Sequence, residues 1–183
     1  MKSWVLQQKK IKVMLTPEID VIIETSLHLS RHGWVIKDIS IPRGQVLDYS
    51  TQKRELNTKF ARGGINVDNI DLRTNGPDIV AVQDEKVWRI ECKGLGAGKS
   101  QTLRNNFDRA VASAVSYYDG EATHIGLAIP MEYAFLGFVK RRVPKALRNA
   151  LNLWVFLLEP DGCTVKDIRP DGHSSLHLQG GVT

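Results

Sequence analysis

The stretch GPDIVAVQDEKVWRIECKG, residues 76–94, decides how the rest of the chain is interpreted. Its two apolar runs, DIVAV and KVWRIEC, are short and rich in β-branched or aromatic residues, which is typical of strands. Asp84 and Glu85 between them predict a turn, so we expect the runs to pair as a hairpin. The spacing from Asp78 to Glu91 would then allow the two carboxylates to meet.

The end of the second run carries side chains suited to metal-assisted hydrolysis. Strand side chains alternate between faces, so Glu91 and Lys93 should point the same way while the Cys92 side chain points into the core. Two carboxylate ligands, from Asp78 and Glu91, suit Mg²⁺ or Mn²⁺. With an ammonium to orient or help deprotonate water, this set predicts hydrolysis of a phosphodiester bond.

An alternative interpretation arises from GLGAGKS, residues 94–100, which looks like a nucleotide-binding phosphate loop. Such a loop requires a glycine, four residues and then Gly-Lys-Ser/Thr. The position that requires the first glycine is Lys93, and Gly94 leaves one residue too few. The sequence therefore favours a glycine-rich strand exit, with Lys99 as a candidate contact for DNA phosphate.

The remainder of the chain alternates between helical and strand patterns. Thr16 is a candidate N-cap and Pro17 the first position of a helix that ends at Gly33. The other expected elements are strand 34–41, helix 50–62, a helix capped by Ser100, strand 123–129, a helical segment 132–151 broken near Pro144, and a hairpin 153–168 around Asp161-Gly162.

Composition is that of an ordinary globular protein. The 183 residues are 42% hydrophobic and 25% charged, which predicts one domain over residues 1–183, with residues 173–183 as a flexible tail. No apolar run approaches the roughly 18 residues of a membrane span, and MKSW leads into no apolar signal region, so we expect a cytoplasmic protein. Cys92 and Cys163 form no zinc or disulfide pattern.

The hairpin resembles the site of the PD-(D/E)xK nuclease superfamily, which includes restriction endonucleases, Holliday-junction resolvases and recombination exonucleases. Pro77 and Asp78 match the "PD" element, and Glu91 and Lys93 match "(D/E)xK". The resemblance implies a restriction-endonuclease-like α/β fold, in which a central mixed sheet is flanked by helices. It also implies Mg²⁺- or Mn²⁺-dependent DNA hydrolysis, with the Cys92 carbonyl as a further metal ligand.

The resemblance extends to the order of elements from about Thr16 to Pro130. In the recombination-nuclease branch, the helix after the motif carries a glutamine four residues before a tyrosine. Here FDRAVASAVSYY has Arg109 and Tyr117 in place, but Ser113 stands where the glutamine would be. Arg109 is a candidate DNA contact, although a polar stripe facing water is the simpler interpretation.

The first helix of resolvase-like members supplies another acidic residue, and Glu24 is the best match. Glu18 and Asp20 share its helix, and a solvated acid is the alternative for each.

Basic residues mark a candidate surface for DNA. The net charge is +5, and VKRRVPKALR contains no acid, so Lys140, Arg141 and Arg142 are candidate phosphate contacts or a solvated helix face. We therefore expect a Mg²⁺-dependent deoxyribonuclease, and a homodimer by resemblance alone. The alternative is a DNA-binding module on the same fold with little or no catalysis.

Overall fold

The computed structural model describes residues 15–43, 47–120 and 123–173. Its elements, in chain order, are α1 (Glu18–Arg31), β1 (Val35–Ser40), α2 (Tyr49–Arg62), the 3₁₀ turn η1 (Val67–Asn69), β2 (Asp71–Arg73), β3 (Ile79–Gln83), β4 (Lys86–Cys92), α3 (Ser100–Ser116), β5 (Thr123–Pro130), α4 (Tyr133–Arg142), α5 (Lys145–Leu151), β6 (Leu153–Leu158) and β7 (Val165–Ile168).

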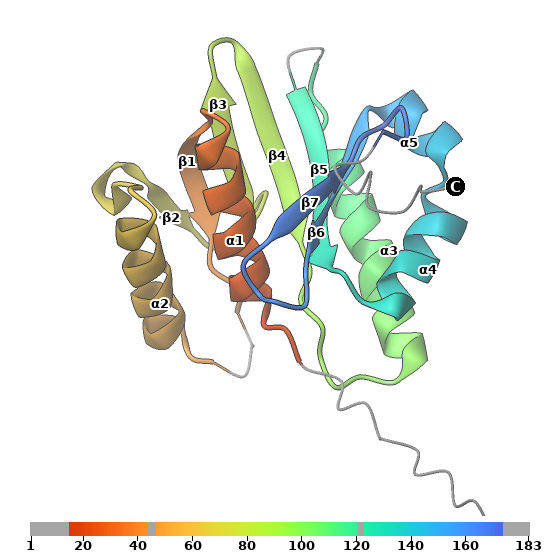
Figure 1. The fold of residues 1–183 in the computed structure, drawn as a ribbon, viewed down its shortest axis with the longest axis horizontal. Helices are drawn as coiled ribbons and strands as arrows, with labels where there is room; N and C mark the ends of the chain where they lie inside the picture. The colour runs from red at the N-terminus through yellow and green to blue at the C-terminus, as the bar shows by residue number, and fades with distance from the viewer. Residues whose placement is uncertain (1–14, 44–46, 121–122, 174–183) are drawn as a thin grey trace, which may run out of the picture.

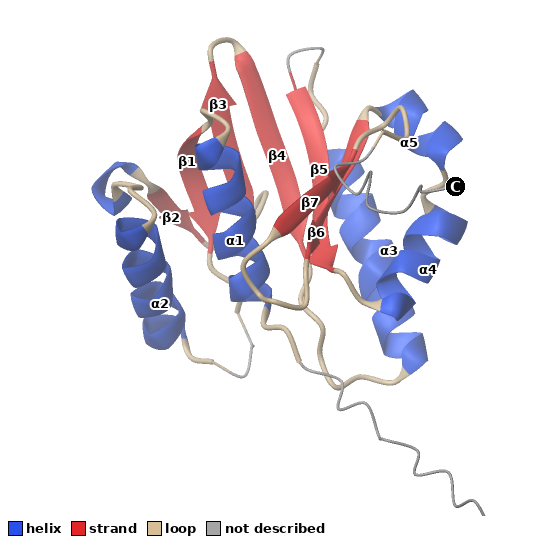
Figure 2. Ribbon diagram, in the orientation of Figure 1, coloured by secondary structure: helices blue, strands red, loops and turns tan. Residues whose placement is uncertain are grey.

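The strands form one mixed seven-stranded sheet in the order β2-β1-β3-β4-β5-β6-β7 (Figure 1). The pairs β1–β2, β4–β5 and β5–β6 are parallel, and β1–β3, β3–β4 and β6–β7 are antiparallel. Figure 2 shows helices on both sides of the sheet. The expected α/β class with a central mixed sheet flanked by helices is therefore confirmed.

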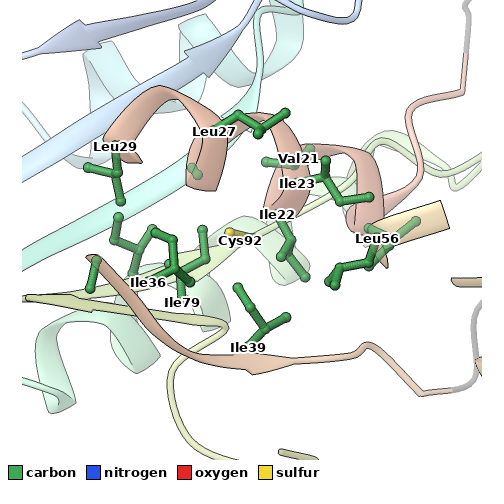
Figure 3. Close-up of a cluster of buried hydrophobic side chains, with 14 of the residues drawn as sticks. Val21, Ile22, Ile23, Leu27, Leu29, Ile36, Ile39, Leu56, Ile79 and Cys92 are labelled. Atoms are coloured by element: carbon green, nitrogen blue, oxygen red, sulfur yellow. The ribbon is translucent and has the colours of Figure 1, made fainter. Parts of the chain in front are cut away.

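Two apolar cores lie on opposite faces of the sheet. On one face, α1 packs across the centre of the sheet, and Ile22 and Ile23 belong to the same buried cluster as Ile39, Ile79 and Cys92 (Figure 3). On the other face, the apolar side of α3 and α4 covers β5 and β6. Burial on both faces explains why the central strands read as nearly continuous apolar runs rather than as alternating ones.

The predicted hairpin is confirmed. β3 and β4 pair with Ile79 opposite Ile90 and Gln83 opposite Lys86. Asp84 takes a positive φ of 52° in the turn, a conformation that aspartate tolerates better than most residues. The C-terminal hairpin of β6 and β7 and the helix break at Pro144 are also as expected.

Two predicted helix starts are wrong by one residue. Pro17, not Thr16, is the N-cap of α1, because the Thr16 backbone is extended and forms an isolated bridge with Leu95. Lys99, not Ser100, is the N-cap of α3, and no side chain caps either helix.

Other boundaries also differ from the sequence pattern. α2 begins at Tyr49, one residue early, because Asp48 accepts a hydrogen bond from the Thr51 amide at 2.9 Å. β2 was not predicted at all, since its three residues are too few to show a periodic pattern.

No helix among the described residues is long and apolar enough to cross a membrane. Of the expected flexible tail, residues 174–183 lie outside the described part of the chain.

Candidate active site

Asp78 and Glu91 lie opposite each other across the β3–β4 pair. The register that pairs Ile79 with Ile90 continues by one step to Asp78 and Glu91, and opposite residues of an antiparallel pair share a face. The Asp78 carboxylate also accepts a hydrogen bond from the Cys92 backbone amide at 2.7 Å. The structure therefore brings together the two carboxylates that the sequence predicted.

Strand alternation holds Glu91 away from the α1 core. Trp88, Ile90 and Cys92 are buried in that core, and Cys92 is fully buried, as expected. Glu91 points to the other face, where the Tyr117 hydroxyl donates a hydrogen bond to its Oε2 atom at 2.7 Å.

Tyr117 is the C-cap of α3 and is fixed at two further points. Its hydroxyl lies 3.2 Å from the Gly76 carbonyl oxygen, and its own carbonyl accepts a hydrogen bond from Arg89 at 3.1 Å. Burial and the neighbouring Glu91 charge raise the pKa of the Tyr117 hydroxyl, while a hydrogen bond with Ser113 partly opposes them. Tyr117 therefore keeps its proton and remains a donor to Glu91. Ser113, the residue that stands in place of the glutamine expected from the family pattern, contacts Tyr117.

Lys93 forms an ion pair with Glu18, an acid of helix one that the sequence did not single out. Lys93 Nζ lies 2.5 Å from Glu18 Oε2, and Glu18 is only 7% exposed. A Cβ atom on Gly94 would lie 2.5 Å from the Glu18 amide nitrogen, so only glycine permits this close approach. The glycine directly after Glu-Cys-Lys was the one sequence signal that another backbone segment passes close to the end of this strand. The structure shows that this segment is the start of α1.

Glu24 lies outside this cluster. Its Oε1 atom is 3.1 Å from Lys59 Nζ, which also lies 3.2 Å from Asp20. Both acids therefore join α1 to α2 through Lys59. The structure places Glu18, rather than Glu24, as the helix-one acid beside Lys93, because the chain after β4 passes under the first turn of α1.

The charges at the site are not balanced. Burial first, and then the charges of Glu91 and Glu18, raise the pKa of Asp78 well above its usual value. Burial also raises the pKa of Glu91, against the hydrogen bond from Tyr117 and the charge of Lys93. Three carboxylates face one ammonium group, which leaves an excess of two negative charges when all are ionised.

Asp78 and Glu91 are the side chains at this site that could hold a divalent cation. Among the described residues, no group of three or more His, Cys, Asp or Glu side chains is arranged to hold a metal ion. Mg²⁺ often takes only one or two protein carboxylates and completes its shell with water and phosphate oxygens. Asp78 and Glu91 are such a pair, and Glu18 is engaged by Lys93.

Hydrogen bonds in residues 93–95 argue against a phosphate loop. The Lys93 amide donates to Ala128 O at 2.8 Å, and the Leu95 amide donates to Thr16 O at 2.8 Å. The Gly94 amide faces Glu18 Oε2 at 3.5 Å. A phosphate loop needs such amides free to surround the phosphates. Gly94 and Leu95 instead bind the segment after β4 to the start of α1 through these contacts with Thr16 and Glu18.

The candidate DNA contacts fall in two places. Lys99 and Arg109 are exposed, at the start of α3 and on its outer face. Lys140, Arg141 and Arg142 are exposed in the last turn of α4, where Arg142 pairs with Asp108 at 2.9 Å.

α4 starts where β5 ends and runs back along the sheet. Its last turn therefore lies about 10 Å of helix rise beyond the start of the helix, away from the end of β5. Lys99 lies in the segment that directly follows β4, the strand that carries Glu91, whereas the α4 cluster follows β5.

No known protein family, curated protein or solved structure shows a significant match to this chain. Interpretation of the site therefore depends on its own residues and contacts.

Proposed function

We propose that this protein is a metal-dependent nuclease that hydrolyses DNA phosphodiester bonds, built on a restriction-endonuclease-like fold. The observation that carries the proposal is the convergence of Asp78, Glu91 and Lys93 at the adjoining ends of β3 and β4. The fold assignment is supported by the mixed sheet, with α1 on one face and α3 on the other.

In the proposed site, Asp78, Glu91 and the Cys92 carbonyl would hold Mg²⁺ or Mn²⁺. When bound, such an ion activates water and offsets the charge that develops on the phosphate oxygens. Tyr117 restricts Glu91 by its hydrogen bond, and Asp78 is restricted by the Cys92 amide. The protein thus orients both carboxylates before substrate arrives.

Lys93 would act as a hydrogen-bond donor rather than as a base. Burial by itself would lower the pKa of Lys93, but Glu18, Asp78 and Glu91 raise it above the ordinary value. Lys93 therefore holds its proton at neutral pH, and its ammonium can orient the attacking water or contact a phosphate oxygen. Glu18 positions that ammonium through the ion pair.

Exposed cations would supply affinity for the DNA backbone. Lys99 and Arg109 would contact phosphates beside the site, and Lys140, Arg141 and Arg142 would contact a more distant part of the same DNA. Such contacts position nucleic acid without reading its sequence.

The test is cleavage of plasmid, branched and single-stranded DNA, with and without Mn²⁺, by the wild-type protein and by Asp78→Asn. We expect cleavage only with metal, and a folded but inactive variant. Asn retains an oxygen that can accept from the Cys92 amide, so loss of activity would reflect loss of the charge. Full activity in folded Asp78→Asn would refute the proposed site. Metal-independent DNA binding with no cleavage by the wild type would favour a non-catalytic binding module.

A further inference from the structure

A cavity of about 360 Å³ adjoins the candidate active site. Lys93 and Glu18 line it and also form the ion pair beside the two carboxylates. The volume far exceeds the roughly 30 Å³ share of one water molecule, and lies in the range of about 300–1,000 Å³ typical of small-molecule pockets. The cavity is therefore large enough for part of a substrate whose phosphate lies at Lys93.

The walls of the cavity are mostly apolar and come from separate parts of the chain. The start of α1, the segment after β4 and the segment before α2 all contribute. The apolar residues are Leu15, Pro17, Ile19, Leu47, Leu95 and Ala97. A flat apolar group would gain free energy by leaving water for this space.

One deeply buried amide gives the cavity a polar feature. Gln52 lines the cavity and is 2% exposed. Its Nε2 atom donates to Pro42 O at 3.1 Å and to Leu47 O at 2.8 Å, which fixes the orientation of the amide. Its Oε1 atom is buried and accepts no hydrogen bond from the described residues. A buried acceptor without a donor is costly, so the fixed Gln52 amide is a polar group in an otherwise apolar wall.

The α3 helix connects the cavity to the carboxylate pair. Asn106 lines the cavity, and Tyr117 contacts Glu91. Their spacing with Arg109 and Ser113 places all four residues on one face of the helix. A DNA strand that follows this face would pass from Glu91 to the cavity, with Arg109 between them.

We propose that the cavity receives one unpaired nucleobase of the DNA strand that is cleaved, and this inference rests on the nuclease function proposed above. The base would lie between the apolar walls, with its phosphate at Lys93. Every DNA base has flat faces that can pack against apolar walls, so the cavity accepts an unpaired base rather than a particular sequence. Extruding a base from a duplex costs a few kcal/mol. The substrate class is therefore DNA with unpaired nucleotides, such as single-stranded ends, flaps or gaps, rather than intact duplex.

The test uses short single-stranded oligonucleotides that carry one abasic residue at each successive position around the cleaved bond. Cleavage is measured with Mn²⁺, and binding is measured without metal by fluorescence anisotropy. We expect one abasic position to lower both affinity and kcat/KM by about 5- to 100-fold, the range for loss of one base contact. Intact duplex should be cleaved more slowly than the single strand.

A variant that fills the cavity tests whether the loss of affinity for abasic substrates arises there. Ala97→Phe should weaken binding of the normal oligonucleotide and remove the difference between normal and abasic substrates. Ala146→Phe makes the same change at an exposed position of α5 and serves as the matched control, with wild-type behaviour expected.

Each outcome is decisive for a different claim. Cleavage and binding that are insensitive to abasic residues at every position would overturn the base-pocket inference and leave the nuclease function standing. Binding that depends on one base, without any cleavage, would support the base-pocket inference and refute the proposed nuclease function. Absence of binding to any oligonucleotide would overturn both.

Discussion

The ammonium of Lys93 is surrounded by more negative charge than it can neutralise. Glu18, Asp78 and Glu91 raise the pKa of Lys93 against its burial. Burial and the charges of Glu91 and Glu18 raise the pKa of Asp78, and burial and the charge of Glu18 raise the pKa of Glu91. Such an arrangement is unfavourable for the stability of the protein alone, because buried like charges repel. A bound divalent cation would offset this repulsion, which supports the proposed metal-dependent reaction.

The contrast between Glu18 and Glu24 gives the first prediction. Glu18→Gln should lower DNA cleavage by about 10- to 100-fold, the usual effect of removing a partner that orients a site residue. Glu24→Gln should leave cleavage unchanged and cost at most about 1 kcal/mol of stability, because Lys59 retains Asp20. Single-turnover cleavage and urea unfolding of both variants would measure this. A larger loss of cleavage in Glu24→Gln would reverse the assignment of the helix-one acid.

Two neighbouring tyrosines permit a second comparison. The Tyr117 hydrogen bond lowers the pKa of Glu91, so Tyr117→Phe should raise that pKa further and let protons compete better with metal. We expect Mn²⁺ affinity to fall by about 10-fold, and by more at pH 6 than at pH 8. Tyr118 is 51% exposed, and Tyr118→Phe is the control that should bind Mn²⁺ normally. Calorimetric titration at the two pH values measures the effect, and equal affinities for both variants would contradict it.

At the scale of elements, local patterns predicted most helices and strands, and tertiary contacts decided the rest. The β3–β4 hairpin and α3 have clear periodicity and turn residues, so the sequence was sufficient. β2 is too short for a pattern, and the Thr16 N-cap prediction failed because a bridge to Leu95 extends that residue. Helical spacing alone does not show which acid of α1 meets Lys93. That choice depends on where the loop after β4 crosses the helix.

The crossing of that loop under α1 gives a third prediction. Gly94→Ala would place a Cβ atom 2.5 Å from both Thr16 O and the Glu18 amide nitrogen, so backbone must move. We expect a loss of about 1–3 kcal/mol, the usual cost of overpacking, together with reduced cleavage as Glu18 shifts from Lys93. Gly96→Ala meets nothing within 4 Å and is the matched control, with a change under about 0.5 kcal/mol expected. Urea unfolding of the two variants tests this, and equal stability would argue against the close crossing.

At the scale of the whole molecule, the site lies at the end of the central strand β4, between the two helical layers. Glu91 and Tyr117 belong to the α3 face, while Glu18 comes from α1 on the other face. The order of the seven strands depends on pairings between distant segments, so the resemblance to a known family implied a mixed sheet, but the local sequence patterns did not predict this order. The same long-range packing explains why the carboxylate pair, which lies within one hairpin, was predictable, whereas Glu18 was not.

Packing of α1 on the sheet predicts a dependence of stability on pH. Burial first, and then the charges of His32 and Arg31, lower the pKa of His28 to about 4, against the opposing charge of Asp167. The unfolded chain therefore binds a proton more readily than the folded one, and stability should fall as pH decreases from about 6.5 towards 4. His28→Gln should lose less stability than the wild type between pH 7 and pH 5. Urea midpoints at the two pH values measure this, and parallel losses would show that His28 does not contribute.

Single-turnover DNA cleavage by Lys93→Ala and Lys99→Ala, assayed side by side with saturating Mn²⁺, tests the central claim most directly. Lys93 lies at the carboxylate pair, whereas Lys99 is exposed at the start of α3. We predict that Lys93→Ala loses several orders of magnitude in rate, while its DNA and Mn²⁺ binding stay near normal. Lys99→Ala should retain most cleavage with somewhat weaker DNA binding, and neither variant should bind ATP. Wild-type cleavage by Lys93→Ala, or tight ATP binding by the wild type that is lost in Lys99→Ala, would contradict the metal-dependent nuclease assignment.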